Sequence, residues 1–294
     1  MYEEIKKAAN IAKKVRIFSE KLLKPEESLL NIAEQIEQKI IDLGGLPAFP
    51  VNISINNIAA HYTPTFDDKS ILKEGDVVKV DFGVQFDGYM IDTAYTVEIN
   101  DNKYENLIKA SKEALENVRK NIRRDMTLGK IGSIIENTIK SYGYNPIYNL
   151  SGHRIDRYIL HAGENVPNYN NGSDIKLSRG LYAIEPFATN GSGYVKDGEP
   201  STIYIFINIK PIRDPSIRKF MEELFNKYKT LPFCYRWLYK EYGNKVNVKF
   251  AVEYLKKNKI IYEYPVLLEN PGYVVTQFET TFFVNDGVED LMSE

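Results

Sequence analysis

A chain of 294 residues, 43% hydrophobic and 27% charged, is long enough for a sizeable core and has the composition of a globular protein. Its net charge of -2 excludes a strongly basic protein, so nucleic acid is not favoured as a partner, and its one cysteine, Cys234, excludes an internal disulfide and a cysteine-rich zinc site. The charged N-terminal segment lacks the apolar core of a signal peptide, and no run of ~18 apolar residues occurs, so we expect a cytoplasmic protein without a membrane span.

The N-terminal half is expected to combine helices with one hairpin. Its predicted elements are helices over 3–23, 26–43, 103–123 and 128–142, a turn-rich stretch over 47–65 and a β-hairpin over 77–98. The helices follow from apolar residues at helical spacing, and glycines at 44 and 143 suit their C-terminal ends. Asp87-Gly88, between two β-rich apolar runs, is a strong signal for a hairpin turn.

The C-terminal half is expected to contain short strands interrupted by a helical block. Strands are predicted over 147–153, 158–161, 181–187, 202–210, 260–268 and 273–284, and helices over most of 215–258. Asp214 suits the N-cap of the first of these helices, and Pro215 suits its first turn. We therefore interpret 211–264 as a helical insertion in an α+β domain formed by 1–210 and 265–294.

Two aspartates, Asp81 and Asp92, lie within the otherwise apolar strands of the hairpin. If Asp87 and Gly88 form a two-residue loop, Asp81 pairs with Ala94, which places Asp92 on the same face of the sheet. The two carboxylates would then be diagonal neighbours with backbones ~7–8 Å apart, which suits ligands of a pair of bridged cations. A bulge that turns one aspartate to solvent, or a slipped register, would separate them instead.

Histidine occurs only three times, as His61, His153 and His161, each in a turn- or glycine-rich segment. Such segments carry functional side chains more often than cores do, although surface or internally bonded histidines would give the same pattern. Glu185 and Glu279 stand alone in apolar, β-rich runs. A carboxylate there is costly unless it is paired, binds a metal or faces solvent at a strand edge.

A buried cluster of these acids would need cations. Asp81, Asp92, Glu185 and Glu279 supply four negative charges, which two divalent ions would balance, while His153 would bind as a neutral ligand. Oxygen-rich ligation with one imidazole suits Co, Mn, Fe(II) or Zn. Spacing alone does not select these five residues.

Longer sequence motifs do select the four acids and His153. The segments FPVNISINNIAAHYTP, VVKVDFGVQFDGYMIDTAYTV, NLSGHRIDRYILHAGENVPN, YAIEPF and QFETT resemble the type II methionine aminopeptidases, in order and over nearly the whole chain. The resemblance implies the pita-bread fold, with a central antiparallel sheet, two pseudo-symmetric halves and the helical insertion of type II. It also implies removal of the initiator methionine from the N-terminal peptide of nascent proteins, near the ribosome, when the second residue is small.

The resemblance assigns a role to each metal ligand. Asp81 would bind one of two ions, Asp92 and Glu279 would bridge both, and His153 and Glu185 would bind the other. Glu185 would also accept a proton from the attacking water and later pass one to the leaving amine. The short N-terminus resembles that of archaeal members, whereas eukaryotic members carry a long charged extension that would serve for docking on the ribosome. The family resemblance also implies a monomer.

Three further residues match positions that contact the substrate. His161 would stabilise the tetrahedral oxyanion, and His61 would hold the scissile amide or help to protonate the leaving nitrogen. Phe49 matches a position in the methionine side-chain pocket, although ordinary core packing would also account for it.

Two other functions are weighed against this one. Proline-specific aminopeptidases and dipeptidases share the ligand pattern, but they usually carry a further N-terminal domain, for which the 80 residues before Asp81 leave little room. A relative that has lost catalysis and serves as a binding protein would typically lack some of the five ligands, and all five are present here.

Overall fold

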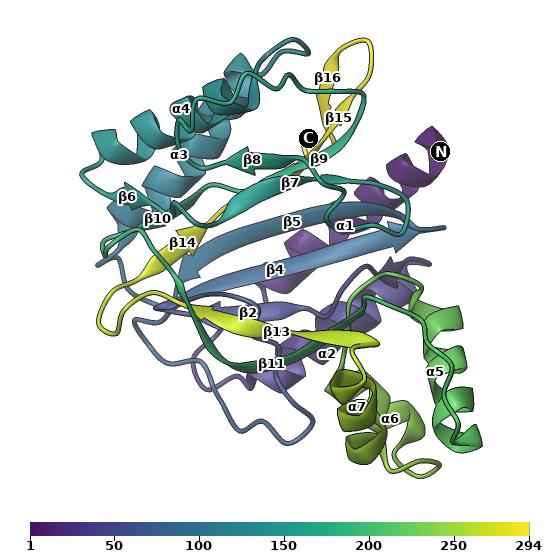
Figure 1. Cartoon of the computed structure of the whole chain (residues 1–294). Helices are drawn as coiled ribbons and strands as arrows, with labels where there is room; N and C mark the ends of the chain where they lie inside the picture. The colour runs from purple at the N-terminus through teal and green to yellow at the C-terminus, as the bar shows by residue number, and fades with distance from the viewer. Residues whose placement is uncertain (294) are drawn as a thin grey trace.

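The computed structural model describes residues 1–293, which contain seven helices and sixteen strands (Figure 1). The helices are α1 (Tyr2–Glu20), α2 (Leu29–Asp42), α3 (Glu105–Asn121), α4 (Leu128–Ser141), α5 (Pro215–Tyr228), α6 (Tyr235–Tyr242) and α7 (Val248–Lys257). The strands are β1 (Leu46–Pro47), β2 (Asn52–Ile55), β3 (Ile58–Ala60), β4 (Val77–Phe86), β5 (Tyr89–Glu98), β6 (Asn145–Pro146), β7 (Ser151–Ile155), β8 (Asn165–Pro167), β9 (Gly180–Ile184), β10 (Phe187–Thr189), β11 (Lys196–Phe206), β12 (Phe233–Cys234), β13 (Ile261–Leu268), β14 (Val275–Gln277), β15 (Thr280–Val284) and β16 (Val288–Asp290). Paired strands are antiparallel throughout these residues, and none of the helices is long and apolar enough to cross a membrane.

The hairpin of β4 and β5 is backed by the N-terminal helices. β4 pairs with β5 along its length, and its other edge pairs with β1 and β2. α1 packs against β4 and β5, behind the sheet in Figure 1. Its buried stripe, which includes Ile5, Ala8, Ala12 and Val15, recurs at helical spacing, so one face of the helix meets the sheet.

A second helix pair covers strands of the other half. α3 packs against β10 and β14, and α4 packs against β6 and β8. The strands of this half form a five-stranded sheet in the order β16-β15-β9-β7-β8 and a three-stranded sheet in the order β14-β10-β6. The expected α+β class is therefore confirmed, with helices outside antiparallel sheets.

The two helix pairs share the same local design. Ser28 and Thr127 each cap the second helix of a pair by accepting a hydrogen bond from a backbone N–H, and each forms an isolated bridge with a distant segment. Both helices are followed by a glycine of positive φ, Gly44 at 87° and Gly143 at 81°, and then by a two-residue strand. This correspondence fits two pseudo-symmetric halves, although no repeat is visible in the sequence.

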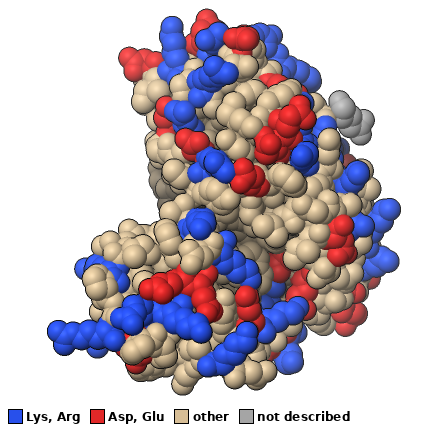
Figure 2. Space-filling view, turned by 90° about the vertical axis from the view of Figure 1, so that its right-hand side faces the viewer, with Lys and Arg blue, Asp and Glu red and all other residues tan. Residues whose placement is uncertain are grey.

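Helices α5, α6 and α7 gather at one end of the molecule, at the lower right of Figure 1. With β11, β12 and β13 they enclose a hydrophobic cluster that includes the buried Leu224, Phe233, Leu238 and Leu255. Asp214 caps α5 as predicted, and all three helices lie within 215–258, so the helical block expected there is confirmed. On the face that Figure 2 shows, acidic and basic side chains are interspersed, in keeping with the small net charge.

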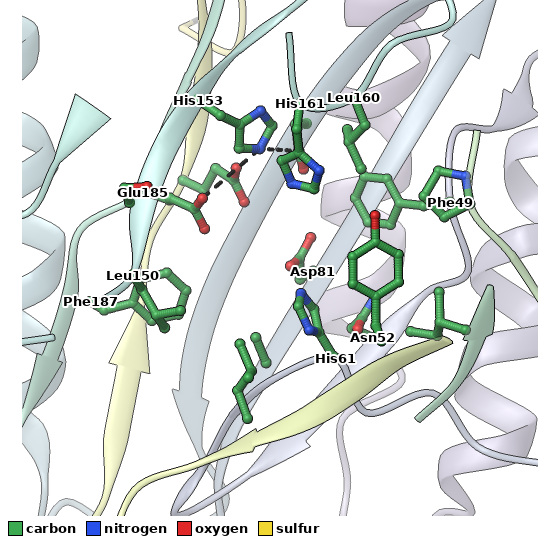
Figure 3. Close-up of a pocket in the computed structure, with 18 of the residues that line it drawn as sticks. Phe49, Asn52, His61, Asp81, Leu150, His153, Leu160, His161, Glu185 and Phe187 are labelled. Carbon is green, nitrogen blue, oxygen red and sulfur yellow. Dashed lines mark ion pairs between the residues drawn. The ribbon is translucent and has the colours of Figure 1, made fainter. Parts of the chain in front are cut away.

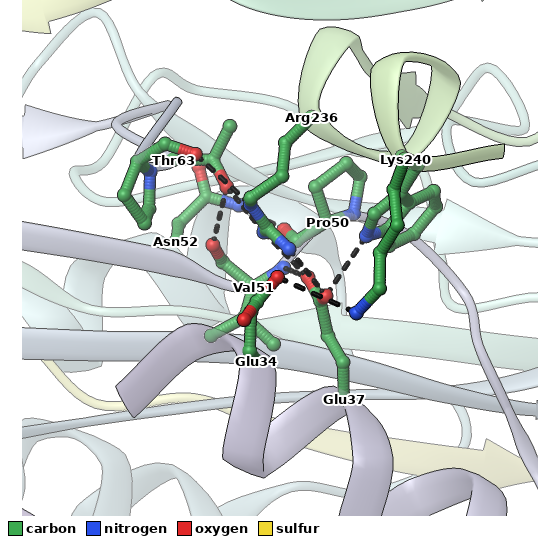
Figure 4. A network of polar contacts seen from close by, with 10 residues as sticks. Glu34, Glu37, Pro50, Val51, Asn52, Thr63, Arg236 and Lys240 are labelled. Carbon is green, nitrogen blue, oxygen red and sulfur yellow. Dashed lines mark hydrogen bonds and ion pairs between the residues drawn. The ribbon is translucent and has the colours of Figure 1, made fainter. Parts of the chain in front are cut away.

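A buried ion pair joins this block to the N-terminal half (Figure 4). Arg236 of α6 donates to both carboxylate oxygens of Glu37 of α2, at 2.7 and 2.8 Å, and the two side chains are only 2% and 8% exposed. Trp237 Nε1 and the backbone N–H of Val51 also donate to Glu37, while Arg236 Nε donates to the carbonyl oxygen of Pro64. The pair therefore holds two helices and both ends of the segment from Val51 to Pro64.

Three local predictions are wrong. Residues 47–65 contain β2 and β3 instead of turns alone, because β2 is buried by its pairing with β4, a long-range contact that local turn signals do not reveal. Residues 158–161 form a turn in place of a strand, because Tyr158 has a φ of 58°. α2 begins at Leu29, since Glu26 has a φ of 67° and Ser28 takes the N-cap.

Candidate metal centre

The hairpin has the register that the sequence predicts. Asp87 and Gly88 have positive φ values of 51° and 80°, which a tight two-residue hairpin turn requires. Asp81 pairs with Ala94, and Asp92 lies two residues before Ala94 on the same strand. Since side chains alternate along a strand, both aspartates lie on one face of the sheet.

The second half brings three more of the predicted residues to this face. The backbone N–H of Glu279 donates to the carbonyl oxygen of Ala94 at 2.9 Å, in an isolated bridge between the halves. Glu279 directly precedes β15 and Glu185 directly follows β9, and these two strands pair, so the glutamates are neighbours. His153 lies within β7, the strand on the other side of β9, at the end of the segment 147–153 that was expected to form a strand.

One cavity of about 230 Å³ brings together every residue that the sequence singles out (Figure 3). These lining residues are Phe49, His61, Asp81, Asp92, His153, His161, Glu185 and Glu279. Figure 3 shows His153 and Glu185 on one side of the space, and Asp81, His61 and Phe49 on the other. The sequence-based grouping of these residues at one site therefore agrees with their positions in the fold.

Distances within the cluster are short enough for shared ligation. His153 Nε2 lies 3.6 Å from Asp92 Oδ2 and 4.0 Å from Glu185 Oε1, as the dashed lines in Figure 3 mark. One ligand atom each from Asp92, His153 and Glu279 lies within 4.8 Å of the other two. A single cation could therefore contact all three of these residues.

Burial raises the pKa of all four acids, and repulsion between carboxylates adds to the rise for three of them. Burial raises the pKa of Asp92 to about 7. Burial, followed by repulsion from neighbouring carboxylates, raises the pKa of Asp81, Glu185 and Glu279 well above ordinary values. Burial lowers the pKa of His153 to about 4, so its ring is neutral at pH 7. The cluster by itself therefore favours protonated acids, and nearby cations would reverse that preference.

The donor atoms fit divalent cations. Oδ1 of Asp81 and Oδ1 of Asp92 are buried, and neither has a hydrogen-bond partner within residues 1–293. Buried polar atoms without a partner are uncommon, and ligation would satisfy both. Carboxylates with one neutral imidazole form the ligand set expected for Co, Mn, Fe(II) or Zn.

His61 is held in one tautomer. It has a φ of 64°, and its Nδ1 lies 3.2 Å from the carbonyl oxygen of Pro265. Because a carbonyl oxygen can only accept, Nδ1 carries the proton and Nε2 is an acceptor. Burial lowers the pKa of His61 to about 4, which keeps the ring neutral. The ring of His161 lies edge-on to that of His153, with 4.4 Å between their centroids.

Phe49 belongs both to the core and to the cavity wall. It is 6% exposed, and a Cβ added to Gly83 would lie only 2.4 Å from its Cε1 atom. Gly83 is the hairpin partner of Asp92, so the aromatic ring packs close to the carboxylates. Only glycine at position 83 leaves room for this ring.

Sequence reasoning missed several residues of the site. Gln277, buried in β14, donates from Nε2 to Glu185 at 3.1 Å and to Glu279 at 3.4 Å, and so orients two of the acids. Its spacing of two residues from Glu279 in a β-rich run is a signal that could have identified it. Tyr264 and Ile203 reach the cavity from β13 and β11, whose long-range pairing has no local signal.

Comparison with known proteins agrees with this geometry. Residues 3–211 match the sequence profile of metallopeptidase family M24. The chain belongs to metallopeptidase family M24. It is 46% identical to a methionine aminopeptidase of Pyrococcus horikoshii over 284 residues, which cover 96% of each chain. As an M24 metallopeptidase, the chain is expected to hold divalent metal ions in the cavity described above.

Similarity to solved structures identifies the fold of the chain. The crystal structure of methionine aminopeptidase from Thermotoga maritima is similar with a TM-score of 0.71 and 22% identity, over 99% of this chain and 96% of that one. The structure of a thermophilic Arx1 is similar with a TM-score of 0.83 and 19% identity, over 98% and 89%. The M24 chain thus has the pita-bread fold that the sequence resemblance implies.

Proposed function

We propose that this protein is a type II methionine aminopeptidase, which removes the initiator methionine from nascent proteins in the cytoplasm. The observation that carries the proposal is the convergence of five acidic and histidine residues on one cavity, as the family's motifs require. The high identity to proteins named methionine aminopeptidase supports the choice of substrate. We further propose the type II form, because helices α5, α6 and α7 fall between Glu185 and Glu279.

Asp81, Asp92, His153, Glu185 and Glu279 would hold two divalent ions. Such ions, when bound, make a water more acidic and polarise the carbonyl group of the scissile peptide bond. Gln277 would keep the carboxylates of Glu185 and Glu279 in place through its two hydrogen bonds.

Proton transfer would fall to Glu185. Its carboxylate lines the cavity and lies 4.0 Å from His153 Nε2, so a substrate bound in the cavity would be within its reach. Its pKa is raised by burial and by neighbouring carboxylates, which suits a group that accepts a proton from water and returns one to the leaving amine.

Two neutral histidines would position the scissile bond. His61 presents Nε2 as an acceptor, which suits a hydrogen bond from the amide N–H of that bond. His161, in contact with the ring of His153, would donate to the oxyanion that forms at the carbonyl oxygen.

Specificity would arise from the shape of the cavity. Phe49, with Leu160 and Phe187, offers apolar surface for a methionine side chain. We propose that residues 211–264 are an insertion that narrows the mouth, since Pro232 of this segment lines the cavity. A narrow mouth would favour a small second residue.

The function is tested with Met-Ala-Ser and Met-Leu-Ser peptides, in the presence of Co or Mn and then of a chelator. Methionine should be released from the first peptide much faster than from the second, and the chelator should stop the release. Cleavage of an Xaa-Pro peptide in place of Met-Ala-Ser would identify a proline-specific enzyme. Failure to cleave any of these peptides with metal bound would identify a binding protein and refute the proposal.

A further inference from the structure

A buried asparagine in the cavity wall has an acceptor that no protein group uses. Asn52 of β2 is 5% exposed and lines the cavity. Its Nδ2 donates to the carbonyl oxygen of Pro50 at 2.8 Å. Because that oxygen can only accept, the amide nitrogen of Asn52 must face Pro50, and Oδ1 points away from Pro50. Oδ1 is buried and has no hydrogen-bond partner within residues 1–293.

The register of the sheet places this acceptor beside the metal ligands. Asn52 pairs with Asp81, Asp81 pairs with Ala94, and Ala94 bridges to Glu279. Directly opposed residues share a face, so Asn52, Asp81 and Glu279 form a row, in which the small Ala94 leaves open space. Figure 3 shows Asn52 on the side of the cavity that carries Asp81 and His61.

Two cavity residues on the same wall do not offer a donor to Oδ1 once cations are held. The carboxylate of Asp81 only accepts when it is ionised, and His61 uses its Nδ1 proton for the carbonyl oxygen of Pro265. Oδ1 is therefore free to accept from a bound molecule. The α-amino group of a peptide is a strong donor, and a peptide with its first side chain against Phe49 and its first carbonyl near the acids would carry that group into the cavity that Asn52 lines.

We propose that Asn52 recognises the free α-amino group of the substrate by accepting a hydrogen bond at Oδ1. The inference rests on the proposed function and adds a residue that distinguishes an N-terminus from an internal peptide bond. The backbone supports this role. The adjacent Val51 donates its N–H to Glu37 and accepts from Thr63 Oγ1 at 2.8 Å, so the segment that presents Asn52 is fixed on both sides.

The test compares two ligands that differ only in the amino group. Methioninamide and its des-amino analogue, 4-(methylthio)butanamide, are used as competitive inhibitors of Met-Ala-Ser hydrolysis, and their binding to the metal-loaded protein is measured by calorimetry. The wild-type protein should prefer methioninamide. In Asn52→Ala this preference should fall about tenfold, the usual scale for losing one hydrogen bond to a charged group. Metal content should be unchanged.

Asn168→Ala is the matched control. Asn168 is also buried, donates from Nδ2 to a backbone carbonyl oxygen, that of Leu150 at 3.1 Å, and has an unpartnered Oδ1 within residues 1–293. It is not among the residues that line the cavity. Its variant should lose similar stability and keep the wild-type preference for methioninamide. If Asn52→Ala does not fold, Asn52→Leu, which has a similar shape and no acceptor, should show the same fall in preference.

Two outcomes would overturn the inference while the proposed function stands. Asn52→Ala could cleave Met-Ala-Ser and retain the full preference for the amino ligand. It could also bind both ligands more weakly by the same factor, as expected if Asn52 only shapes the side-chain pocket or holds a water. A wild-type protein that neither cleaves Met-Ala-Ser nor prefers methioninamide would overturn the proposed function as well.

Discussion

Removal of Arg236 should destabilise the protein far more than removal of an exposed cation. In Arg236→Met, the carboxylate of Glu37 stays buried without its bidentate partner. Loss of one member of a buried ion pair typically costs ~3–5 kcal/mol. With an unfolding entropy of ~2.1 cal/mol/K per residue, a chain of 294 residues should then melt about 5–8 °C lower.

Trp237 makes this loss measurable at the site itself. It is the only tryptophan of the chain, and its Nε1 donates to Glu37 at 2.8 Å. Its fluorescence during unfolding therefore reports on the contact between α6 and α2, while circular dichroism reports on the whole fold. The double variant Glu37→Gln/Arg236→Met removes both charges, so it should cost roughly 2 kcal/mol less than the sum of the single variants.

Lys219→Met is the control. Lys219 of α5 lies 3.9 Å from Glu223, but the two side chains are 79% and 45% exposed, so its loss should change stability by less than ~0.5 kcal/mol. The reasoning fails if Arg236→Met melts within about 2 °C of the wild-type protein. It also fails if the costs of the single variants simply add, because the charges would then not be coupled.

Three further predictions concern the cavity and its surroundings. Gly83→Ala should lower kcat/KM for Met-Ala-Ser by about tenfold, because the new methyl group must displace the ring of Phe49. An unchanged KM would contradict the role of Phe49 in binding the methionine side chain. Asp92→Asn should lose bound metal and nearly all activity, whereas His161→Ala should slow turnover with near-normal metal content. Metal analysis would distinguish the two, and full metal occupancy in Asp92→Asn would refute the role of Asp92 as a metal ligand. Burial lowers the pKa of Lys79 to about 7, so the stability of the wild-type protein should fall as pH drops from about 10 to 7 while unfolded lysine takes up a proton. In Lys79→Met, the free energy of unfolding measured with urea should not show this fall between the two pH values. If it changes with pH as much as in the wild-type protein, Lys79 is charged in the folded protein.

The local parts of the site follow from the sequence. A two-residue turn at Asp87 and Gly88 leaves one register for the hairpin, and that register fixes Asp81 and Asp92 on one face. The helix ends at Gly44 and the cap at Asp214 are equally local, because each depends on a few adjacent residues. Family motifs added the residues of the second half, which spacing alone did not select.

Contacts between distant segments could not be predicted in this way. Glu37 and Arg236 are 199 residues apart, and neither lies in a pattern that names the other as its partner. Asn52 fell in a segment expected to form turns, so its pairing with Asp81 was hidden until β2 was known. Tyr264 reaches the cavity only because β13 pairs with β3 and β11. In each case, tertiary pairing decides which side chains meet.

The seam between the two halves explains how the acids are held together. β5 and the segment before β15 share only one isolated bridge, at Ala94 and Glu279, so a regular ladder does not fix their separation. Threonine hydroxyl groups supply the missing bonds: Thr93 Oγ1 donates to the carbonyl oxygen of Glu279 at 3.0 Å, and Thr281 Oγ1 bonds both the N–H and the carbonyl oxygen of Asp92 at 2.8 Å. These buried bonds tie Asp92 and Glu279, two of the residues that would hold the ions, directly to each other's strands. Mutual repulsion between the two carboxylates is therefore opposed by short polar contacts of their own backbones, which keeps the ligand atoms converged before any cation binds.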